Sequence, residues 1–148
     1  MEVKIKKLTA DAVIPSYAKE GDAGMDLTAV NYTYDKATDN HIYGTGLAVE
    51  IPEGYVGLIF PRSSNRKTNA YLTNHVGVID SGYRGEIILT FKNRIASPAP
   101  FAQKRAPYKV GDRIGQIIIL PYPAIEFVEA EELSETERGE GGHGSTGE

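Results

Sequence analysis

The chain is organised around Gly77-Val78-Ile79-Asp80-Ser81-Gly82-Tyr83-Arg84-Gly85-Glu86-Ile87. An apolar run leads to an acid and a Ser-Gly pair, and a second apolar run continues from Ile87 to residue 91. This layout predicts a strand, a tight turn and a second strand, in which Gly82 is free to take a positive φ. A turn held by strands is a rigid platform, so Asp80 and Tyr83 are candidate functional groups, although Asp, Ser and Gly also favour turns for purely local reasons.

Short segments of the same kind recur along the chain. Apolar or alternating residues predict strands over residues 3–8, 25–34, 47–51, 55–60, 70–79, 85–93, 108–110, 113–120 and 125–128. Pro52-Glu53-Gly54 predicts a turn with Pro52 at its first corner, residues 35–46 a polar connection with room for a short strand, and residues 61–67 one short helical turn. Strands at roughly 8–12-residue spacing favour an all-β sandwich or jelly roll, which we assign to residues 1–128 as a single domain.

The last segment, residues 129–148, has a different composition. It holds seven Glu, five Gly and a single Leu, so it cannot bury a core of its own. One interpretation is a solvated, flexible arm. The other is a strap that orders on a ligand, because the backbone N–H groups of its glycines, with Ser145 and Thr146, suit phosphate oxygens, and Arg138 adds a positive charge.

Charge and composition exclude several classes of function. The net charge of −4 argues against direct binding of nucleic acid, and no apolar run approaches the roughly 18 residues of a membrane span. There is no Cys and no signal peptide follows Met1, which favours the cytoplasm or another intracellular reducing compartment. An anionic small ligand would need local positive charge or a metal ion.

Five segments occur together and in order: residues 22–29, 61–64, 77–85, 111–116 and 138–147. With them the chain closely resembles the trimeric deoxyuridine triphosphatases (dUTPases) from about residue 3 to residue 147. The resemblance implies a distorted jelly roll, a homotrimer with active sites at subunit interfaces, and an arm (129–148) that closes over a neighbouring subunit's site. It also implies Mg²⁺-dependent hydrolysis of dUTP to dUMP and pyrophosphate, which limits uracil in DNA and supplies dUMP for thymidylate synthesis.

The resemblance implies that residues 77–87 bind the end of the substrate that carries the nucleobase and the sugar. Asp80 matches the general base that activates the attacking water, and Tyr83 matches the ring that packs on the deoxyribose and rejects a ribose hydroxyl. Backbone groups of the uracil-reading segment would contact the base edge. In this chain that segment comprises Asn74, Gly77, Val78 and Ile79.

The other segments match contacts to the phosphates. Gln116 matches an α-phosphate donor, and Arg62 matches a residue that either touches phosphate or braces a carboxylate. Asp26 matches a carboxylate that holds Mg²⁺ through water, with a structural hydrogen-bonding role as the alternative. The remaining contacts fall on Ser63 and Ser64 in one segment, and on Arg138, Gly144, Ser145 and Thr146 in the arm.

One position departs from the family pattern. The ring that stacks over uracil is usually Phe, whereas this chain has His143, whose imidazole offers less stacking area. Two other functions compete with the main hypothesis. A dCTP deaminase would need a catalytic Glu and different base-edge chemistry, and a non-catalytic interaction module would not need all the catalytic positions to be filled.

Overall fold

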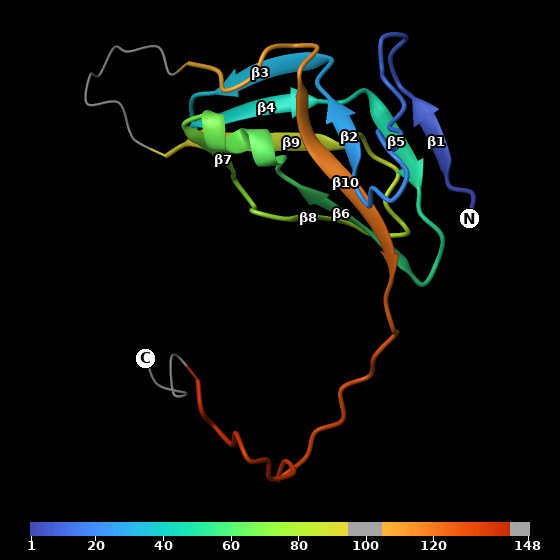
Figure 1. Ribbon diagram of the computed structural model, residues 1–148, viewed down its shortest axis with the longest axis vertical. Coiled ribbons are helices and arrows are strands. Elements are labelled where there is room, and N and C mark those ends of the chain that lie inside the picture. Colours follow the sequence, from blue (N-terminus) through green and yellow to red (C-terminus); the bar gives the residue numbers. More distant parts are fainter. Residues whose placement is uncertain (95–104, 143–148) are drawn as a thin grey trace.

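The computed structural model describes residues 1–94 and 105–142, and it is built almost wholly of β-strands (Figure 1). The elements are β1 (Lys4–Lys7), β2 (Met25–Thr28), β3 (Asn31–Asp35), β4 (Asn40–Gly44), β5 (Leu47–Glu50), β6 (Tyr55–Phe60), the 3₁₀ helix η1 (Ser63–Lys67), β7 (Ala70–Leu72), β8 (Gly77–Ile79), β9 (Ile88–Asn93) and β10 (Arg113–Pro121). No helix in the described ranges is long and apolar enough to cross a membrane.

The strands form three sheets in which every pairing is antiparallel. Two have four strands, in the orders β2-β10-β6-β8 and β3-β4-β9-β7, and β1 pairs with β5 in a small third sheet. Side chains from both large sheets meet in one buried core. Its members include Leu27, Ile59, Ile114, Ile117, Tyr43, Leu89 and Phe91. The predicted all-β sandwich of jelly-roll type is therefore confirmed.

The opening stretch is not a hairpin, which corrects the sequence prediction. Strand β8 pairs with β6 in one large sheet, whereas β9 pairs with β4 and β7 in the other. The turn that begins at Asp80 is closed by a bond from the Tyr83 N–H to the Asp80 carbonyl at 3.0 Å. It thus starts a crossover between two sheets. Gly82 is not among the residues with positive φ, so this turn does not use its conformational freedom.

Residues 47–60 form the predicted strand, turn and strand, and only the place of Pro52 in the turn differs. Residues 47–60 also link two sheets, because β5 pairs with β1 and β6 pairs with β10 and β8. Their turn has Pro52 as its first residue and not at its first corner, since the Tyr55 N–H bonds to the Pro52 carbonyl at 3.1 Å. Gly54 supplies the left-handed corner with φ 80°. The short strand for which the connection over residues 35–46 left room is formed as β4, which pairs with β3.

The chain leaves the sandwich after β10. A bond from the Tyr122 N–H to the Gly54 carbonyl at 2.9 Å is formed beside the last strand, and the following segment extends away from the sheets (Figure 1). The strand predicted over residues 125–128 is not formed, because no neighbouring strand pairs with it in this chain. Its large apolar side chains are exposed, with Phe127 at 91%.

Candidate active site

Strand register brings the first group of candidate residues together. Gln116 on β10 lies opposite Asp26 on β2 and, on its other side, opposite Phe60 on β6. The register of β10 against β2 shifts between Arg113 and Gly115, which is a β-bulge, and this shift sets the pairing of Gln116 with Asp26. Strand β6 ends at Phe60, and the chain then turns into η1, so Arg62 and the two serines that follow it start beside the same row.

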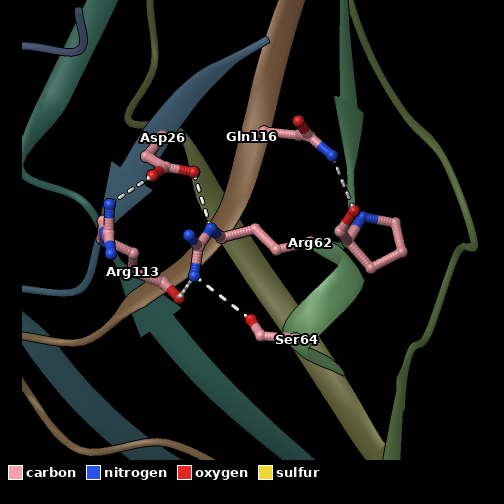
Figure 2. A network of polar contacts seen from close by, with 6 residues as sticks. Asp26, Arg62, Ser64, Arg113 and Gln116 are labelled. Carbon is pink, nitrogen blue, oxygen red and sulfur yellow. Dashed lines mark hydrogen bonds and ion pairs between the residues drawn. The ribbon is translucent and has the colours of Figure 1, made fainter. Parts of the chain in front are cut away.

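The centre of this group is the carboxylate of Asp26, which lies between two guanidinium groups (Figure 2). Arg62 Nε donates to Oδ1 at 2.6 Å and Arg113 Nη1 donates to Oδ2 at 2.9 Å. Arg62 Nη1 donates further to Ser64 Oγ at 3.2 Å and to the Arg113 carbonyl at 3.5 Å. Of the two roles predicted for Arg62, bracing a carboxylate is the one formed in the chain alone.

Gln116 is held by contacts on two sides. Its Nε2 donates to the Pro61 carbonyl at 3.0 Å, which leaves the second N–H of that amide for a ligand (Figure 2). Its other side lies against Gly24, where an added Cβ would overlap Gln116 Oε1 and lie 3.2 Å from Cδ. Gly24 is not in the left-handed region, so the close approach of Gln116, and not backbone conformation, is what calls for glycine there.

These residues line a cleft of about 480 Å³. Its charged side chains are Asp22, Asp26, Arg62 and Arg113, so the two carboxylates and two guanidinium groups balance. Ser63 also lines the cleft and is exposed, whereas Ser64 lies to one side as a hydrogen-bond partner of Arg62. The cleft thus offers several N–H and O–H donors without an excess of charge, which suits a ligand that carries its own counter-ion.

A metal ion fits this cleft only in one way. No group of three or more His, Cys, Asp or Glu residues that could hold a metal exists in the described part of the chain. Both Asp26 oxygens are engaged with arginines, but each keeps a second lone pair for a water molecule. The residues therefore fit Mg²⁺ that arrives on ligand phosphates and meets one carboxylate through water, as this ion commonly does.

The second group of candidates surrounds the turn after β8. Val78, Ile79, Asp80, Tyr83, Glu86 and Ile88 line a smaller hollow of about 220 Å³. Asp80 is exposed, and its carboxylate accepts no hydrogen bond from any residue in the described ranges. Tyr83 Oη donates to the Glu86 carbonyl at 2.9 Å, and Glu86 Oε1 accepts from the Gly46 N–H at 2.8 Å.

Strand β8 forms one wall of this region and lies at an edge of its sheet. Its side away from β6 has no partner strand within residues 1–94 and 105–142, so backbone donors and acceptors remain open there. Val78, at the middle of the strand, is 60% exposed. Asn74 precedes the strand, and its Nδ2 would lie 3.5 Å from a Cβ added at Gly77, so the amide is at the start of the same edge.

The two groups do not meet in one chain. Ile79 pairs with Gly57 near the start of β6, whereas Arg62 follows the end of that strand. At roughly 3.3 Å per extended residue, their backbones are separated by on the order of 15 Å along the sheet. The cleft and the hollow have no lining residue in common. A single chain therefore carries the two groups of candidate residues at different places.

The described part of the arm, residues 129–142, extends away from the sandwich and lines neither the cleft nor the hollow (Figure 1). Arg138 is exposed, and its Nε donates to the Gly141 carbonyl at 2.9 Å. Four other predicted arm contacts lie outside the described residues. They are His143, Gly144, Ser145 and Thr146.

Sequence reasoning missed Arg113, Gly24 and Glu86 as members of these groups. Arg113 lies within the quoted segment 111–116, but its partner Asp26 is 87 residues away in the chain, and only the pairing of β10 with β2 reveals the contact. Gly24 likewise lies in the quoted segment 22–29, and its role depends on the side chain of Gln116 across the same strand pair.

The chain is similar to known proteins in sequence and in structure. The family model described as dUTPase matches residues 10–147. A deoxyuridine 5'-triphosphate nucleotidohydrolase from Nautilia profundicola is 42% identical over 148 residues, which are 99% of this chain and 99% of that protein. A Staphylococcus bacteriophage 80alpha dUTPase mutant, solved with dUpNHpp, superposes with a TM-score of 0.81 at 30% identity, covering 99% of this chain and 98% of that one.

A second solved structure is a mutant dUTPase from phage phi11 of S. aureus, which is described as revealing the coordination of a structural Mg(II) ion. It has a TM-score of 0.73 at 27% identity and covers 89% of this chain and 98% of that one.

Proposed function

This chain belongs to the dUTPase family, and from that premise we propose that it hydrolyses dUTP to dUMP and pyrophosphate through a water activated by Asp80. It is a dUTP nucleotidohydrolase. The proposed mechanism is supported by the observation that the candidate residues fall into two separate groups. One group is an open strand edge with a tyrosine and an unpaired carboxylate, and the other is a cleft rich in N–H donors. These suit the two ends of a nucleoside triphosphate.

A complete site would join the cleft of one copy to the hollow of another, in a homotrimer. The separation of the two groups within one chain supports this arrangement. A second support is the segment after β10, where Ile125, Phe127 and Leu133 are 70%, 91% and 89% exposed. Apolar side chains this exposed are typical of a surface that is covered in an assembly.

In the proposed reaction a water molecule attacks the α-phosphorus of dUTP. A new bond forms between the water oxygen and phosphorus, the water proton passes to an Asp80 oxygen, and the bond from the α-phosphorus to the bridging oxygen breaks. The electron pair leaves on pyrophosphate. Because Asp80 accepts no hydrogen bond from the described residues, both of its oxygens are open for this role.

The cleft residues would stabilise the negative charge that develops on the phosphates. The second N–H of Gln116 Nε2 and the hydroxyl of Ser63 line the cleft and would donate to an α-phosphate oxygen. Arg62 is held in place by Asp26 and still has N–H groups to offer. Bound Mg²⁺ would neutralise phosphate charge, with its waters on Asp26.

The hollow would select the base and the sugar. The open edge of β8 offers backbone groups to the uracil edge, together with the Asn74 amide. The ring of Tyr83 lines the hollow and is 42% exposed, so it is accessible for packing against a deoxyribose. A ring packed there leaves no space for a 2′-hydroxyl, which excludes ribonucleotides by steric overlap.

The arm (129–148) would then close over a site in a neighbouring subunit. Arg138 is exposed and bonded only within the arm among the described residues, so it is available for terminal phosphates. His143 would cap the base, with Gly144, Ser145 and Thr146 beside the phosphates. In the cell, which we take to mean the cytoplasm or another reducing compartment, this activity would limit uracil in DNA and supply dUMP.

The test is phosphate release, with pyrophosphatase added, from dUTP, dTTP, dCTP and UTP in the presence of Mg²⁺. We expect rapid release from dUTP alone. Equal release from all four nucleotides would contradict the proposed selection, and ammonia release from dCTP would identify a deaminase instead.

A further inference from the structure

The ring of Tyr83 occupies a space that only a glycine at position 85 leaves open. A Cβ added at Gly85 would lie 2.5 Å from Cζ and 2.9 Å from Cε2 of Tyr83, and it would overlap Oη. Gly85 is not among the glycines with positive φ, so its backbone is one that any L-residue can adopt. The tyrosine ring is therefore what stands in the way of a side chain at this position.

The Tyr83 side chain is held in this position both at its backbone and at its hydroxyl group. Its backbone is in the turn closed on the Asp80 carbonyl, and its Oη bonds to the Glu86 carbonyl three residues ahead. The bond between Glu86 Oε1 and the Gly46 N–H anchors Glu86 in turn. A tyrosine whose hydroxyl reaches a carbonyl three residues away must cross over the residues between, and here it crosses Gly85.

Tyr83 lines the hollow whereas Gly85 does not. The ring lies against Gly85, and Tyr83 also lines the space that the proposed function assigns to the deoxyribose. A side chain at position 85 would displace the ring from its seat, and the ring would no longer present the surface on which a deoxyribose packs.

We propose that Gly85 is a specificity-determining position, because the absence of a side chain there sets the depth of the Tyr83 ring and hence the discrimination between dUTP and UTP. The inference rests on the proposed role of Tyr83 at the sugar. Gly85 itself acts through the ring and touches no reacting atom.

The test compares kcat/KM for dUTP and UTP in the full-length protein and in Gly85→Ala. We expect the dUTP-to-UTP ratio to fall by about tenfold or more. A displaced ring no longer overlaps the 2′-hydroxyl, which raises kcat/KM for UTP, and it packs less well on deoxyribose, which raises KM for dUTP. A wild-type protein that does not prefer dUTP would refute the proposed function. A selective wild type with an unchanged ratio in Gly85→Ala would overturn only the role of Gly85.

Gly82→Ala is a matched control from the same crossover segment between β8 and β9. Gly82 also lacks a positive φ, a Cβ there would meet nothing within 4 Å, and it lines a different hollow. We expect its ratio to equal that of the wild type. A ratio that falls as far as in Gly85→Ala would mean that any added methyl in this segment has this effect, and the proposal would fail.

The Tyr83→Ala background separates the ring from other causes. With the ring removed, adding Gly85→Ala should leave both the ratio and the melting temperature as they are in Tyr83→Ala alone. This comparison decides the matter even if Gly85→Ala alone does not fold. A double variant that loses further selectivity, or does not fold, would show that position 85 acts through something other than Tyr83.

Discussion

The cleft around Asp26 and the hollow around Asp80 differ in how their central carboxylates are held: that of Asp26 is fixed by neighbouring side chains, and that of Asp80 is not. In the cleft the central carboxylate is paired with two arginines, and Gln116 is fixed by the Pro61 carbonyl and by Gly24. In the hollow Asp80 is exposed and accepts no bond from the described residues. In the proposed mechanism, the groups that would stabilise phosphate charge are positioned in advance, whereas the group that would accept a proton is left open.

The same difference suggests what each part lacks. The cleft has donors, but its carboxylates, Asp22 and Asp26, already accept hydrogen bonds. The hollow has the open carboxylate of Asp80 but no positively charged side chain for phosphate. Each is therefore a complement of the other, which is the physical reason for proposing that two copies combine them. The following variants act on one part or the other, and their effects should differ in kind.

The largest effect is expected from Asp80→Asn in the hollow. The amide keeps the shape of the side chain but is a far poorer proton acceptor, so turnover should fall by roughly 10²–10⁴-fold. Binding of dUTP should persist, because the cleft is untouched. Isothermal titration with dUTP and steady-state rates measure the two quantities, and substantial residual turnover would remove Asp80 from the role of base.

Asp26→Ala in the cleft should act on binding as well as rate. It leaves Arg62 and Arg113 without the carboxylate that fixes them, and it removes the proposed ligand for the waters of Mg²⁺. We expect a loss of about 10–100-fold in kcat/KM and a higher Mg²⁺ concentration for half-maximal rate. If the Mg²⁺ dependence is unchanged, Asp26 is a structural brace for the arginines only.

Gly24→Ala should have a smaller effect in the same cleft. The new methyl group overlaps Gln116 Oε1, so the amide must move away from the Pro61 carbonyl and from the ligand. We expect kcat/KM to fall by about tenfold, which is the scale expected when one hydrogen-bond donor to the substrate is displaced. The control is the same substitution in a Gln116→Ala background, where adding Gly24→Ala should cause no further loss of kcat/KM. An added loss there would show that Gly24 serves another contact.

The smallest effect is expected at His143, which lies outside the described residues. If this side chain caps the base of a bound nucleotide, His143→Phe increases the stacking area and should lower KM for dUTP a few-fold, on the order expected for one aromatic contact. The rate at saturation should change little. An unchanged KM would mean that the residue at 143 does not cover the base.

Local pattern predicted the all-β class and most strand positions, because alternation and turn residues are local signals. It did not predict which strands pair. Strands β8 and β9 follow one another as a hairpin would, yet they belong to different sheets, and the choice is made by contacts with β6 on one side and with β4 and β7 on the other. Residues 125–128 alternate like a strand but lack a partner strand in this chain.

The candidate site shows the same limit. The resemblance to a family pointed to Asp26, Arg62 and Gln116 separately, and register explains why they meet, since Gln116 lies opposite both Asp26 and Phe60. The Arg113 contact could not be foreseen from spacing, because it depends on the bulge in β10. Nor could the role of Gly85 be foreseen, as it depends on the direction of the Tyr83 ring.

The central claim is that a working site combines the cleft of one copy with the hollow of another, and mixed assemblies test it most directly. Asp80→Asn chains keep an intact cleft, and Asp26→Ala chains keep an intact hollow. Co-refolding the two variants in equal amounts should make about one quarter of the sites intact, the fraction expected for random assembly of a closed oligomer. The rate of dUTP hydrolysis should then be about one quarter of the wild-type rate. A mixture no more active than the sum of its two parents would contradict the claim.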